Sequence, residues 1–402
     1  MAVISTTKRK AFSGGSWPTA QQELLLRAAL QQGSEALNAW EMWKKAVPFD
    51  QMDPASVRLL PLVYRNMQTQ CDLEDPLLQK LKGVYRHAWA MNQLLLQNVA
   101  GVIRSFGESG IDTMLLKGAA LVTCYYKDYA LRPMNDFDVL VQPKQAIQAI
   151  GLLKESGYRL REPTPSESPE VYIQLLHGFH FYNDSGNELD LHWHVFSECL
   201  RDDSDRDFWS ASEPVEFFGV ATHVLSSADQ LLHVCVHGLI WDPVPPIRWI
   251  ADALYILDSC KSRLDWDRVI FQAKSRRLIL FLRNALRYLS ELRADLVPVE
   301  TLEELGRSGT SLMERLEYKY KTQNRPNHPL GHLPQIWFNY ARRSEETRIH
   351  RKLFGFIKCL AQFFGIHRWW QLPFFFAYKA LRRMVLICRL YQRRLVSAFQ
   401  RQ

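Results

Sequence analysis

Paired cysteines and long hydrophobic runs are both missing from this sequence. Its seven cysteines are scattered through 402 residues without a CxxC pair, so neither a disulfide framework nor a structural zinc site is indicated. No stretch reaches about 18 uninterrupted apolar residues, which argues against a membrane-spanning helix. Residues 1–16 lack the apolar run of a signal peptide, and a flexible leader is expected there. These absences predict a cytoplasmic protein with reduced thiols.

Acidic side chains are scarce at the C-terminal end of the chain. Residues 341–402 contain 14 Lys and Arg but two Glu, whereas the preceding 340 residues contain 36 basic and 40 acidic side chains. The formal net charge of +8 therefore arises in the tail, and any polyanionic partner would have to bind there. Apolar residues make up 47% of the chain, which is enough for a buried core and excludes an intrinsically disordered protein.

Hydrophobic spacing divides the chain after the leader into four segments. Residues 17–108 repeat apolar side chains at helical spacing and predict a helical N-terminal subdomain. Residues 109–222 follow the order β-α-β-α-β-β, which predicts a small mixed β-sheet with helices on one face. Helical spacing returns in residues 223–323, and residues 324–402 suggest a linker followed by a basic, aromatic helical tail. The expected fold class is α+β.

Three carboxylates are predicted to converge on the sheet of this central segment. Asp136 and Asp138 begin an apolar strand, where side chains two residues apart share a face. Asp190 lies in a later strand that follows a predicted turn at Asp184–Asn187. Buried carboxylates repel one another unless a cation lies between them, and such oxygen ligands suit Mg²⁺. His192 shares the face of Asp190, either as a hydrogen-bonded buried histidine or as a contact of the active site.

The residues around these carboxylates resemble a known family. The matching stretches are Leu59-Leu-Pro-Leu-Val-Tyr-Arg, Leu115-Leu-Lys-Gly-Ala-Ala-Leu, Leu131-Arg-Pro-Met-Asn-Asp-Phe-Asp-Val-Leu-Val, Glu188-Leu-Asp-Leu-His-Trp and Arg248-Trp-Ile-Ala-Asp-Ala-Leu-Tyr-Ile-Leu. Together they resemble an uncharacterised bacterial nucleotidyltransferase family with an LKG…R…DxDLLV signature, within the DNA polymerase β-like nucleotidyltransferase superfamily. The resemblance covers roughly residues 20–275.

This resemblance implies that the protein transfers a nucleotidyl group from a nucleoside triphosphate to an acceptor and releases pyrophosphate. Two bound Mg²⁺ ions would assist the reaction. Asp136 and Asp138 would hold the metals, and Asp190 would complete the catalytic metal site and help to deprotonate the acceptor. The acceptor is a hydroxyl, amine or phosphate group that the sequence does not identify. Two alternatives stay open: a catalytically silent nucleotide-binding or assembly protein, and nucleotidylation of a protein or RNA.

The expected phosphate-binding segment departs from the superfamily pattern. Members usually carry a Gly-Ser pair shortly before the DxD strand, whereas here the pair is Lys117-Gly118, no Ser follows, and 17 residues separate Gly118 from Asp136. A helix N-terminus and Lys117 still offer N–H groups and positive charge to a nucleotide phosphate. Gly118 alternatively serves only to end the strand. Arg132 is expected either to clamp phosphate or to pair with Asp136 or Asp138.

Two further groups of polar residues lie at helical spacing. Asp229, His233 and His237 occupy positions i, i+4 and i+8 of a predicted helix. Structural hydrogen bonding is favoured for them over metal binding, because apolar residues between them indicate a helix packed into a core. Arg248 and Asp252 are expected to form an intrahelical ion pair, with a role facing the nucleotide as the alternative.

The C-terminal tail mixes basic and aromatic residues. The apolar stretch 353–366 is followed by His367-Arg-Trp-Trp and Leu372-Pro-Phe-Phe-Phe-Ala-Tyr. This composition is typical of a helix on an anionic membrane surface, so residues 341–402 are a candidate contact with the inner face of the membrane. Packing of the aromatic rings on the helical domain is the alternative. Single-stranded nucleic acid is disfavoured as a partner, because no recognition motif accompanies the basic residues.

Overall fold

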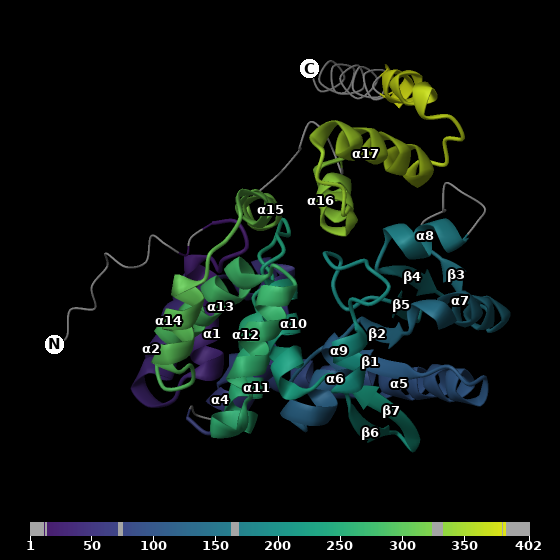
Figure 1. Ribbon diagram of the computed structural model, residues 1–402. Helices are drawn as coiled ribbons and strands as arrows, with labels where there is room; N and C mark the ends of the chain where they lie inside the picture. Colours follow the sequence, from purple (N-terminus) through teal and green to yellow (C-terminus); the bar gives the residue numbers. More distant parts are fainter. Residues whose placement is uncertain are drawn as a thin grey trace, which may run out of the picture. The chain divides into compact units, whose positions relative to one another are not determined.

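The computed structural model describes residues 12, 14–70, 75–161, 169–323, 333–379 and 381–382. Most of the predicted leader and the whole of the linker stretch 324–331 therefore lie outside the described residues. Contacts divide the chain into two units, which Figure 1 shows: unit 1 comprises residues 1–162 and 176–331, and unit 2 comprises residues 163–175 and 332–402.

The N-terminal helices of unit 1 begin at capping residues that the sequence provides. They are α1 (Ala20–Leu30), α2 (Gly33–Ala46), α3 (Pro54–Val57), α4 (Leu60–Met67) and α5 (Pro76–Glu108), with a single 3-10 turn at Phe49–Gln51. Thr19 and Gln22 form a capping box at the start of α1. Asp53 accepts hydrogen bonds from the backbone amides of Ala55 and Ser56 ahead of α3. The helix start expected at Asp53-Pro54 is therefore present.

Seven strands form one mixed sheet in the order β3-β4-β5-β2-β1-β7-β6. They are β1 (Thr113–Leu116), β2 (Asp136–Val141), β3 (Arg159–Leu160), β4 (Gly178–Tyr182), β5 (Glu188–His192), β6 (Glu213–Phe217) and β7 (Val220–Val224). β2 pairs antiparallel with β1 and parallel with β5, and β1 pairs parallel with β7. The expected α+β class is confirmed. The segments between the strands include α6 (Lys117–Leu121), a π-helix (Val122–Tyr126), a 3-10 turn (Pro143–Gln145), α7 (Ala146–Glu155) and α9 (Arg206–Ser210).

The two faces of the sheet differ in polarity at β2 and β5. Phe137, Val139 and Leu189 are almost fully buried on one face. Asp136 and Asp138 alternate with them and therefore lie on the other face. The long helix α5 contacts β1, β2, β7 and α7. This alternation leaves a polar strip along the middle of one face of an otherwise apolar sheet.

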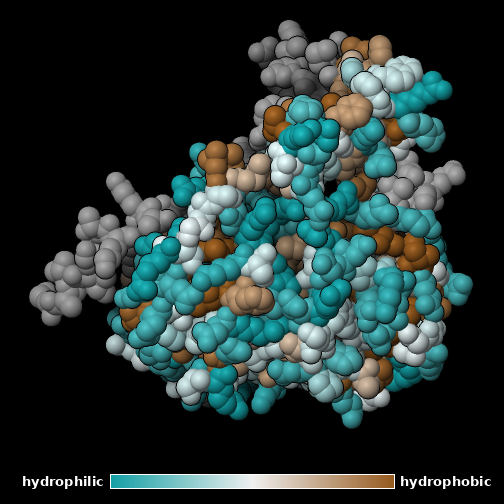
Figure 2. Space-filling view, viewed as in Figure 1, coloured by the Kyte–Doolittle hydropathy of each residue, from teal (hydrophilic) through white to brown (hydrophobic). Residues whose placement is uncertain are grey.

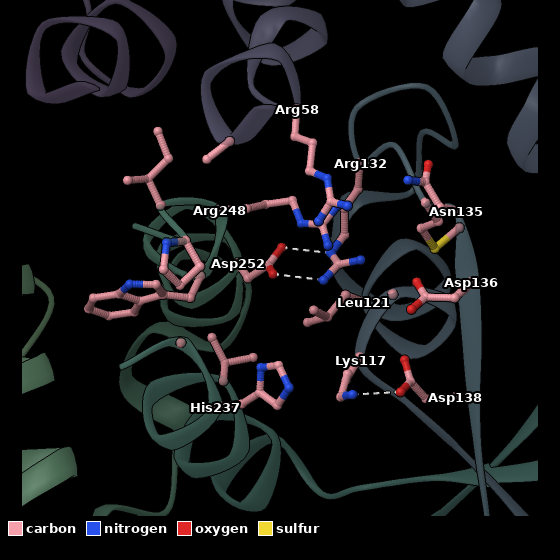
Figure 3. Close-up of a pocket in the computed structure, with 18 of the residues that line it drawn as sticks. Arg58, Lys117, Leu121, Arg132, Asn135, Asp136, Asp138, His237, Arg248 and Asp252 are labelled. Atoms are coloured by element: carbon pink, nitrogen blue, oxygen red, sulfur yellow. Dashed lines mark hydrogen bonds and ion pairs between the residues drawn. The ribbon is translucent and has the colours of Figure 1, made fainter. Parts of the chain in front are cut away.

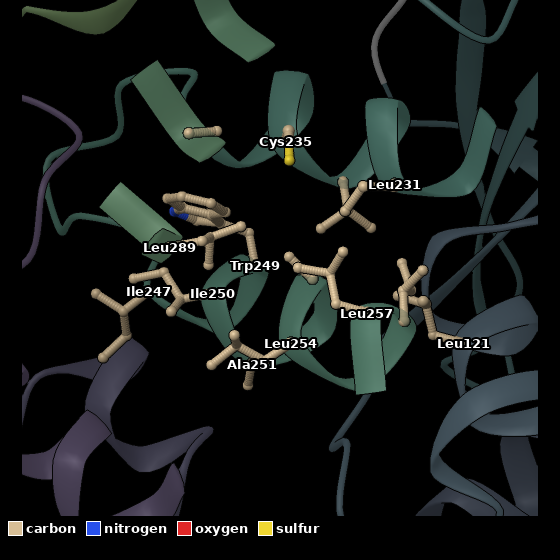
Figure 4. Packing of buried hydrophobic residues seen from close by; sticks show 14 of the residues in the cluster. Leu121, Leu231, Cys235, Ile247, Trp249, Ile250, Ala251, Leu254, Leu257 and Leu289 are labelled. Carbon is tan, nitrogen blue, oxygen red and sulfur yellow. The ribbon is translucent and has the colours of Figure 1, made fainter. Parts of the chain in front are cut away.

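One hydrophobic core joins the helices that precede the sheet to those that follow it. The later helices are α10 (Ser227–Gly238), α11 (Arg248–Cys260), α12 (Trp266–Ser275), α13 (Ile279–Leu292), α14 (Val299–Arg307) and α15 (Leu312–Thr322), with a 3-10 turn at Lys261–Arg263. Buried Leu25 and Trp40 belong to the same cluster as Ile250 and Leu289. Figure 4 shows the part of this core around α10 and α11, to which Leu121 of α6 contributes. The core thus extends to the segment that follows β1.

Unit 2 is helical and has a small apolar core of its own. Its elements are α8 (Pro169–Leu175), α16 (Leu333–Arg343), α17 (Ile349–Phe363), a 3-10 turn (Trp369–Gln371) and helical residues 372–379 and 381–382. Ile336, Leu360, Ala361 and Leu372 form the buried cluster. Every helix in the described part of the chain is too short or too polar to cross a bilayer. The last 20 residues of the tail lie outside the described residues.

Candidate active site

The pairing of β2 with β5 brings two of the expected carboxylates together. Asp138 is the register partner of Asp190, and Asp136 is the partner of Glu188. One oxygen of Asp138, one oxygen of Asp190 and one ring nitrogen of His192 all lie within 4.8 Å of one another. Asp136 lies two residues before Asp138 on the same strand and face. The candidate site therefore has Asp138 and Asp190 at its centre.

Asp138 is held between two nitrogen groups. Its Oδ1 lies 2.6 Å from Nζ of Lys117 and 3.0 Å from Nε2 of His192. Burial opposes ionisation of this carboxyl group, but Lys117 and His192 outweigh that effect and keep the pKa of Asp138 well below its usual range. Asp138 is consequently a buried anion. Such a group is stable only where positive charge lies beside it.

Asp190 is less completely compensated than Asp138. Its buried Oδ1 makes no hydrogen bond, although Nδ1 of His180 lies 2.8 Å away. Burial and the nearby charge of Asp138 raise the pKa of Asp190. His180 also lies 3.4 Å from Glu188, which pairs with Arg161. A buried carboxylate oxygen without a hydrogen bond, next to a second carboxylate, is a position that a cation would stabilise.

Lys117 and Gly118 place the start of α6 close against β2. Lys117 has a left-handed backbone with φ of 44°, which is strained for a residue with a side chain and is often found at functional sites. A Cβ atom at Gly118 would lie 2.4 Å from Sδ of Met134 and 2.6 Å from Nη1 of Arg132. Only glycine fits there without movement. The space beside Gly118 is filled by side chains, so this glycine has a packing role.

Arg132 pairs with Asp252 and with neither of its expected partners on β2. Its Nε and Nη2 donate to the two carboxylate oxygens of Asp252 at 2.8 and 2.9 Å, and Tyr126 donates to the same carboxylate. The intrahelical pair expected between Arg248 and Asp252 was wrong. The folding of α11 against the segment before β2 brings together Arg132 and Asp252, which are 120 positions apart in the sequence. This fork-shaped pair fixes that segment in place.

The site opens into a cavity of about 420 Å³ in unit 1. Figure 3 shows Asp136, Asp138 and Lys117 on one side of it, and Arg58 and Arg248 on another. Arg248 also donates a hydrogen bond to the carbonyl oxygen of Pro133. Strand residues and residues from the helical segments therefore line a single space.

The helical triplet of Asp229, His233 and His237 does not act as one group. Asp229 forms an ion pair with Arg268 at 2.6 Å, which is a structural role of the kind favoured for it from the sequence. His233 and His237 instead line the cavity, with ring centroids 6.0 Å apart. Burial, reinforced by the charge of Lys117, lowers the pKa of His233 to about 3. The imidazole of buried His233 is therefore uncharged near neutral pH.

Three residues of the site were not identified from the sequence. The register of the β4–β5 hairpin pairs His180 with Asp190 and Tyr182 with Glu188. Counting outward from the turn predicted at Asp184–Asn187 pairs Phe181 with Asp190 instead, one residue out of the observed register, so the pattern did not identify His180. Arg58 and His177 carry no local signal either. The ring of half-buried His177 lies 5.2 Å from that of His192, a proximity that only the tertiary structure shows.

A mixed sheet whose central strand carries a DxD pair, with a third carboxylate on its parallel neighbour, has the arrangement of a nucleotidyltransferase. Residues 55–294 match the family described as "Uncharacterised nucleotidyltransferase", and the chain belongs to that family. The family resemblance seen in the motifs is thereby confirmed, and the family implies a nucleotide substrate.

Similarity to individual proteins is weak. An antigenic nucleotidyltransferase-like protein from Paracoccidioides brasiliensis aligns with 16% identity and a TM-score of 0.35, over 52% of this chain and 92% of that protein. No curated protein matches the chain significantly.

Proposed function

We propose that the protein is a Mg²⁺-dependent nucleotidyltransferase that moves a nucleoside monophosphate from a nucleoside triphosphate to an acceptor and releases pyrophosphate. The observation that carries this proposal is the meeting of Asp138 and Asp190 within 4.8 Å, on the face that also carries Asp136. Family membership supports the class of reaction. The metal, the donor nucleotide and the acceptor chemistry belong to the proposal.

The side chains present fit a hard divalent cation. Asp190 offers a buried oxygen without a hydrogen bond, and Asp138 offers an oxygen whose present neighbours are cationic or imidazole nitrogens. Asp136, Asp138 and Asp190 would hold two Mg²⁺ ions, with His192 beside them. Bound Mg²⁺ supplies charge neutralisation at the phosphates and activation of the attacking group.

The protein's own residues orient the substrate and handle the proton. Lys117 places a positive charge in the cavity next to Asp138, where it would stabilise negative charge on the transferred phosphate. Arg132 and Gly118 act as positioning residues, because they fix the segment around Lys117 and Met134. Asp190 has a raised pKa, and we assign it the role of accepting the proton of the acceptor.

The direct test offers each nucleoside triphosphate, labelled at the α-phosphate, with Mg²⁺ and a mixture of small-molecule and macromolecular acceptors. Wild-type protein is expected to release pyrophosphate and to label a product. Asp138→Asn and Asp190→Asn should each lower turnover by at least about a hundredfold, because each removes charge that the transition state needs. Asp202→Asn, at an exposed aspartate, is the matched control and should behave as wild type.

The same experiment separates the alternatives. Label in a protein or RNA band would identify a macromolecular acceptor. Nucleotide binding without pyrophosphate release across the whole panel would instead favour the catalytically silent protein. Full turnover by folded Asp138→Asn protein would refute the assignment.

A further inference from the structure

Ion pairing within the cavity wall leaves two arginines without a carboxylate partner. Lys117 is paired with Asp138, and Arg132 with Asp252. Within the part of the chain that the structure describes, Arg58 and Arg248 form no ion pair, although both line the cavity. Figure 3 shows Asp136 and Asp138 at the sheet and Arg58 and Arg248 at the helices, and Asp242, between α10 and α11, also lines the cavity.

The two arginines come from distant segments and converge. Arg58 follows the last residue of α3, and Arg248 is the first residue of α11. Arg58 is exposed, so its guanidinium group is accessible from the cavity. The bond from Arg248 to the carbonyl oxygen of Pro133 fixes the position of its head group. Guanidinium groups held in this way match the oxygens of phosphate.

The charge of Arg248 is less completely compensated than that of Arg132. Burial, and then the charge of nearby Arg132, lower the pKa of Arg248 to about 9, and Arg58 adds to that effect. Asp252, which already pairs with Arg132, is the carboxylate that acts on Arg248. A phosphate oxygen bound between the guanidinium groups would remove this unfavourable interaction.

We propose that Arg58 and Arg248 bind a phosphate group of the substrate in this cavity. The assignment deepens the proposed function and rests on it. Met134 and Arg132 fill the space beside Gly118, so the start of α6 offers a phosphate less room than the opposite wall does. The ligand chemistry is phosphate, carried either by the donor nucleotide or by a phosphorylated acceptor.

The test titrates the full chain with inorganic tripolyphosphate in metal-free buffer, followed by calorimetry. Arg58→Gln and Arg248→Gln should each weaken binding about tenfold, because each removes a charge-assisted hydrogen bond. Arg248→Lys should retain part of the affinity. Arg287→Gln, at an exposed arginine of α13 outside the cavity, should change nothing. Arg58 makes no hydrogen bond to any residue that the structure describes, so the Arg58→Gln variant is expected to fold normally and keeps the test decisive.

Two further arms identify the source of the phosphate. If the Arg58→Gln variant binds a non-hydrolysable nucleoside triphosphate more weakly than wild type does, the arginines bind the donor nucleotide. If it binds the triphosphate as wild type does but binds glycerol phosphate more weakly, the arginines bind the acceptor. Unchanged affinity of both arginine variants for all three probes would overturn the inference. The Asp138→Asn variant is expected to lose turnover and to keep metal-free tripolyphosphate binding. Loss of phosphate binding and loss of turnover are therefore separate readouts for this inference and for the proposed function.

A second, independent observation concerns the surface of unit 2. Trp370, Phe374, Tyr378 and Leu381 follow helical spacing and are between 49% and 70% exposed. Large apolar side chains so exposed on one face normally have a binding partner. Figure 2 shows brown and teal residues interleaved on this part of the surface.

Cations lie close to aromatic rings of this segment. The guanidinium group of Arg382 lies 5.8 Å from the ring centroid of exposed Tyr378, and Nζ of Lys379 lies 4.8 Å from the ring centroids of half-buried Phe364 and Phe375. Residues 341–402 carry 14 basic side chains against two acidic ones. An apolar, aromatic face bordered by cations complements an anionic lipid headgroup layer better than it complements another copy of this basic segment.

We infer that this face binds an anionic membrane surface. Full-length protein should float with vesicles of phosphatidylcholine and phosphatidylserine at low salt, and less at high salt or with phosphatidylcholine alone. Phe374→Ser should reduce flotation several-fold, because it removes a large apolar ring from the face. Phe271→Ser, at an equally apolar exposed ring in unit 1, should not.

Three results would overturn this second inference. They are absence of flotation at low salt, equal flotation of the Phe374→Ser variant, and displacement of bound vesicles by a single-stranded RNA.

Discussion

The charged side chains around the site are held by partners far away in the sequence. Asp252 accepts two hydrogen bonds from Arg132 and one from Tyr126, and both Asp252 and Arg132 are about 95% buried. Removal of one member of such a pair leaves an uncompensated buried charge, and the loss is much larger than the value of the pair itself. The segment between α6 and β2 is therefore held by this buried pair, together with hydrogen bonds between Asn92 of α5 and the backbone of Arg132 and Met134.

Asp252→Ala is expected to lower the free energy of unfolding by about 3–5 kcal/mol, because Arg132 would stay buried without its anion. Asp258→Ala is the matched control: this residue lies on the same helix and pairs with Arg293 at the surface. The Asp258→Ala change should lower the free energy of unfolding by no more than about 1 kcal/mol. Urea denaturation measures both, and equal losses would contradict the buried-pair account.

His233 makes stability depend on pH. Burial, with the charge of Lys117, lowers its pKa from 6.5 to about 3, so the unfolded chain binds a proton that the folded chain refuses. Stability is therefore greatest above pH 6.5 and declines as the pH falls toward 3. Unfolding in urea at a series of pH values should show a shallower decline for His233→Gln than for wild type. His87→Gln, at an exposed histidine, should leave the slope unchanged, and identical slopes for all three proteins would refute the effect.

Some residues of the site were predictable and others were not. Strand periodicity put Asp136 and Asp138 on one face, and the hairpin turn put Asp190 on a later strand. Both signals are local. The partner of Arg132 depends on how α11 folds back across the chain, and no local pattern encodes that. The same holds for Arg58, which reaches the cavity from the N-terminal helices.

At the scale of elements, α10 and α11 approach closely where they meet. A Cβ atom at Gly238 would lie 2.1 Å from Cγ of Trp249. The ring of Trp249 thus packs directly on the glycine backbone, and Trp249 also lines the cavity. The fit between these two helices consequently shapes one wall of the candidate site.

Gly238→Ala is expected to destabilise the protein by about 1–3 kcal/mol, because the added methyl group forces Trp249 to move. Gly83→Ala in α5 is the control, since its added methyl group meets no described atom within 4 Å. That change should stabilise by about 0.5–1 kcal/mol through helix propensity. Thermal unfolding measures the melting temperature of both variants. A shift of the melting temperature in the same direction for both would contradict this packing.

The elements were predicted unevenly. Helices and the central strands β1, β2, β4 and β5 follow clear apolar periodicity and were anticipated. The β6–β7 hairpin was not, because β6 is short and Pro214 within it argues against a strand. Proline is tolerated there since β6 is an edge strand. The tight turn has positive φ at Phe218 and Gly219, and phenylalanine gives no warning of that conformation.

At the scale of the whole molecule, the strands of the sheet lie between two groups of helices in the sequence. In the folded protein these two groups share one hydrophobic core. Tyr288 of α13 donates a hydrogen bond to Glu23 of α1 at 2.7 Å, and both helices contribute to the same buried cluster. Apolar periodicity identified helical segments on either side of the sheet. It contains no information on which of them pack together.

The shared core predicts that α1 and α13 unfold in one cooperative step. Hydrogen exchange followed by mass spectrometry under increasing denaturant should give the same opening free energy for their most protected amides. Separate opening free energies for the two helices would contradict a common core.

The central claim is that Asp138 and Asp190 create a divalent-cation site for a nucleotide. Its most direct measurement is calorimetric titration of a non-hydrolysable nucleoside triphosphate with and without Mg²⁺, on wild type, Asp138→Asn, Asp190→Asn and the Asp202→Asn control. We predict Mg²⁺-dependent binding that each of the first two variants weakens at least about tenfold, since each removes a metal ligand, and that the control retains. Binding of equal strength with and without Mg²⁺, unaffected by either variant, would contradict the account.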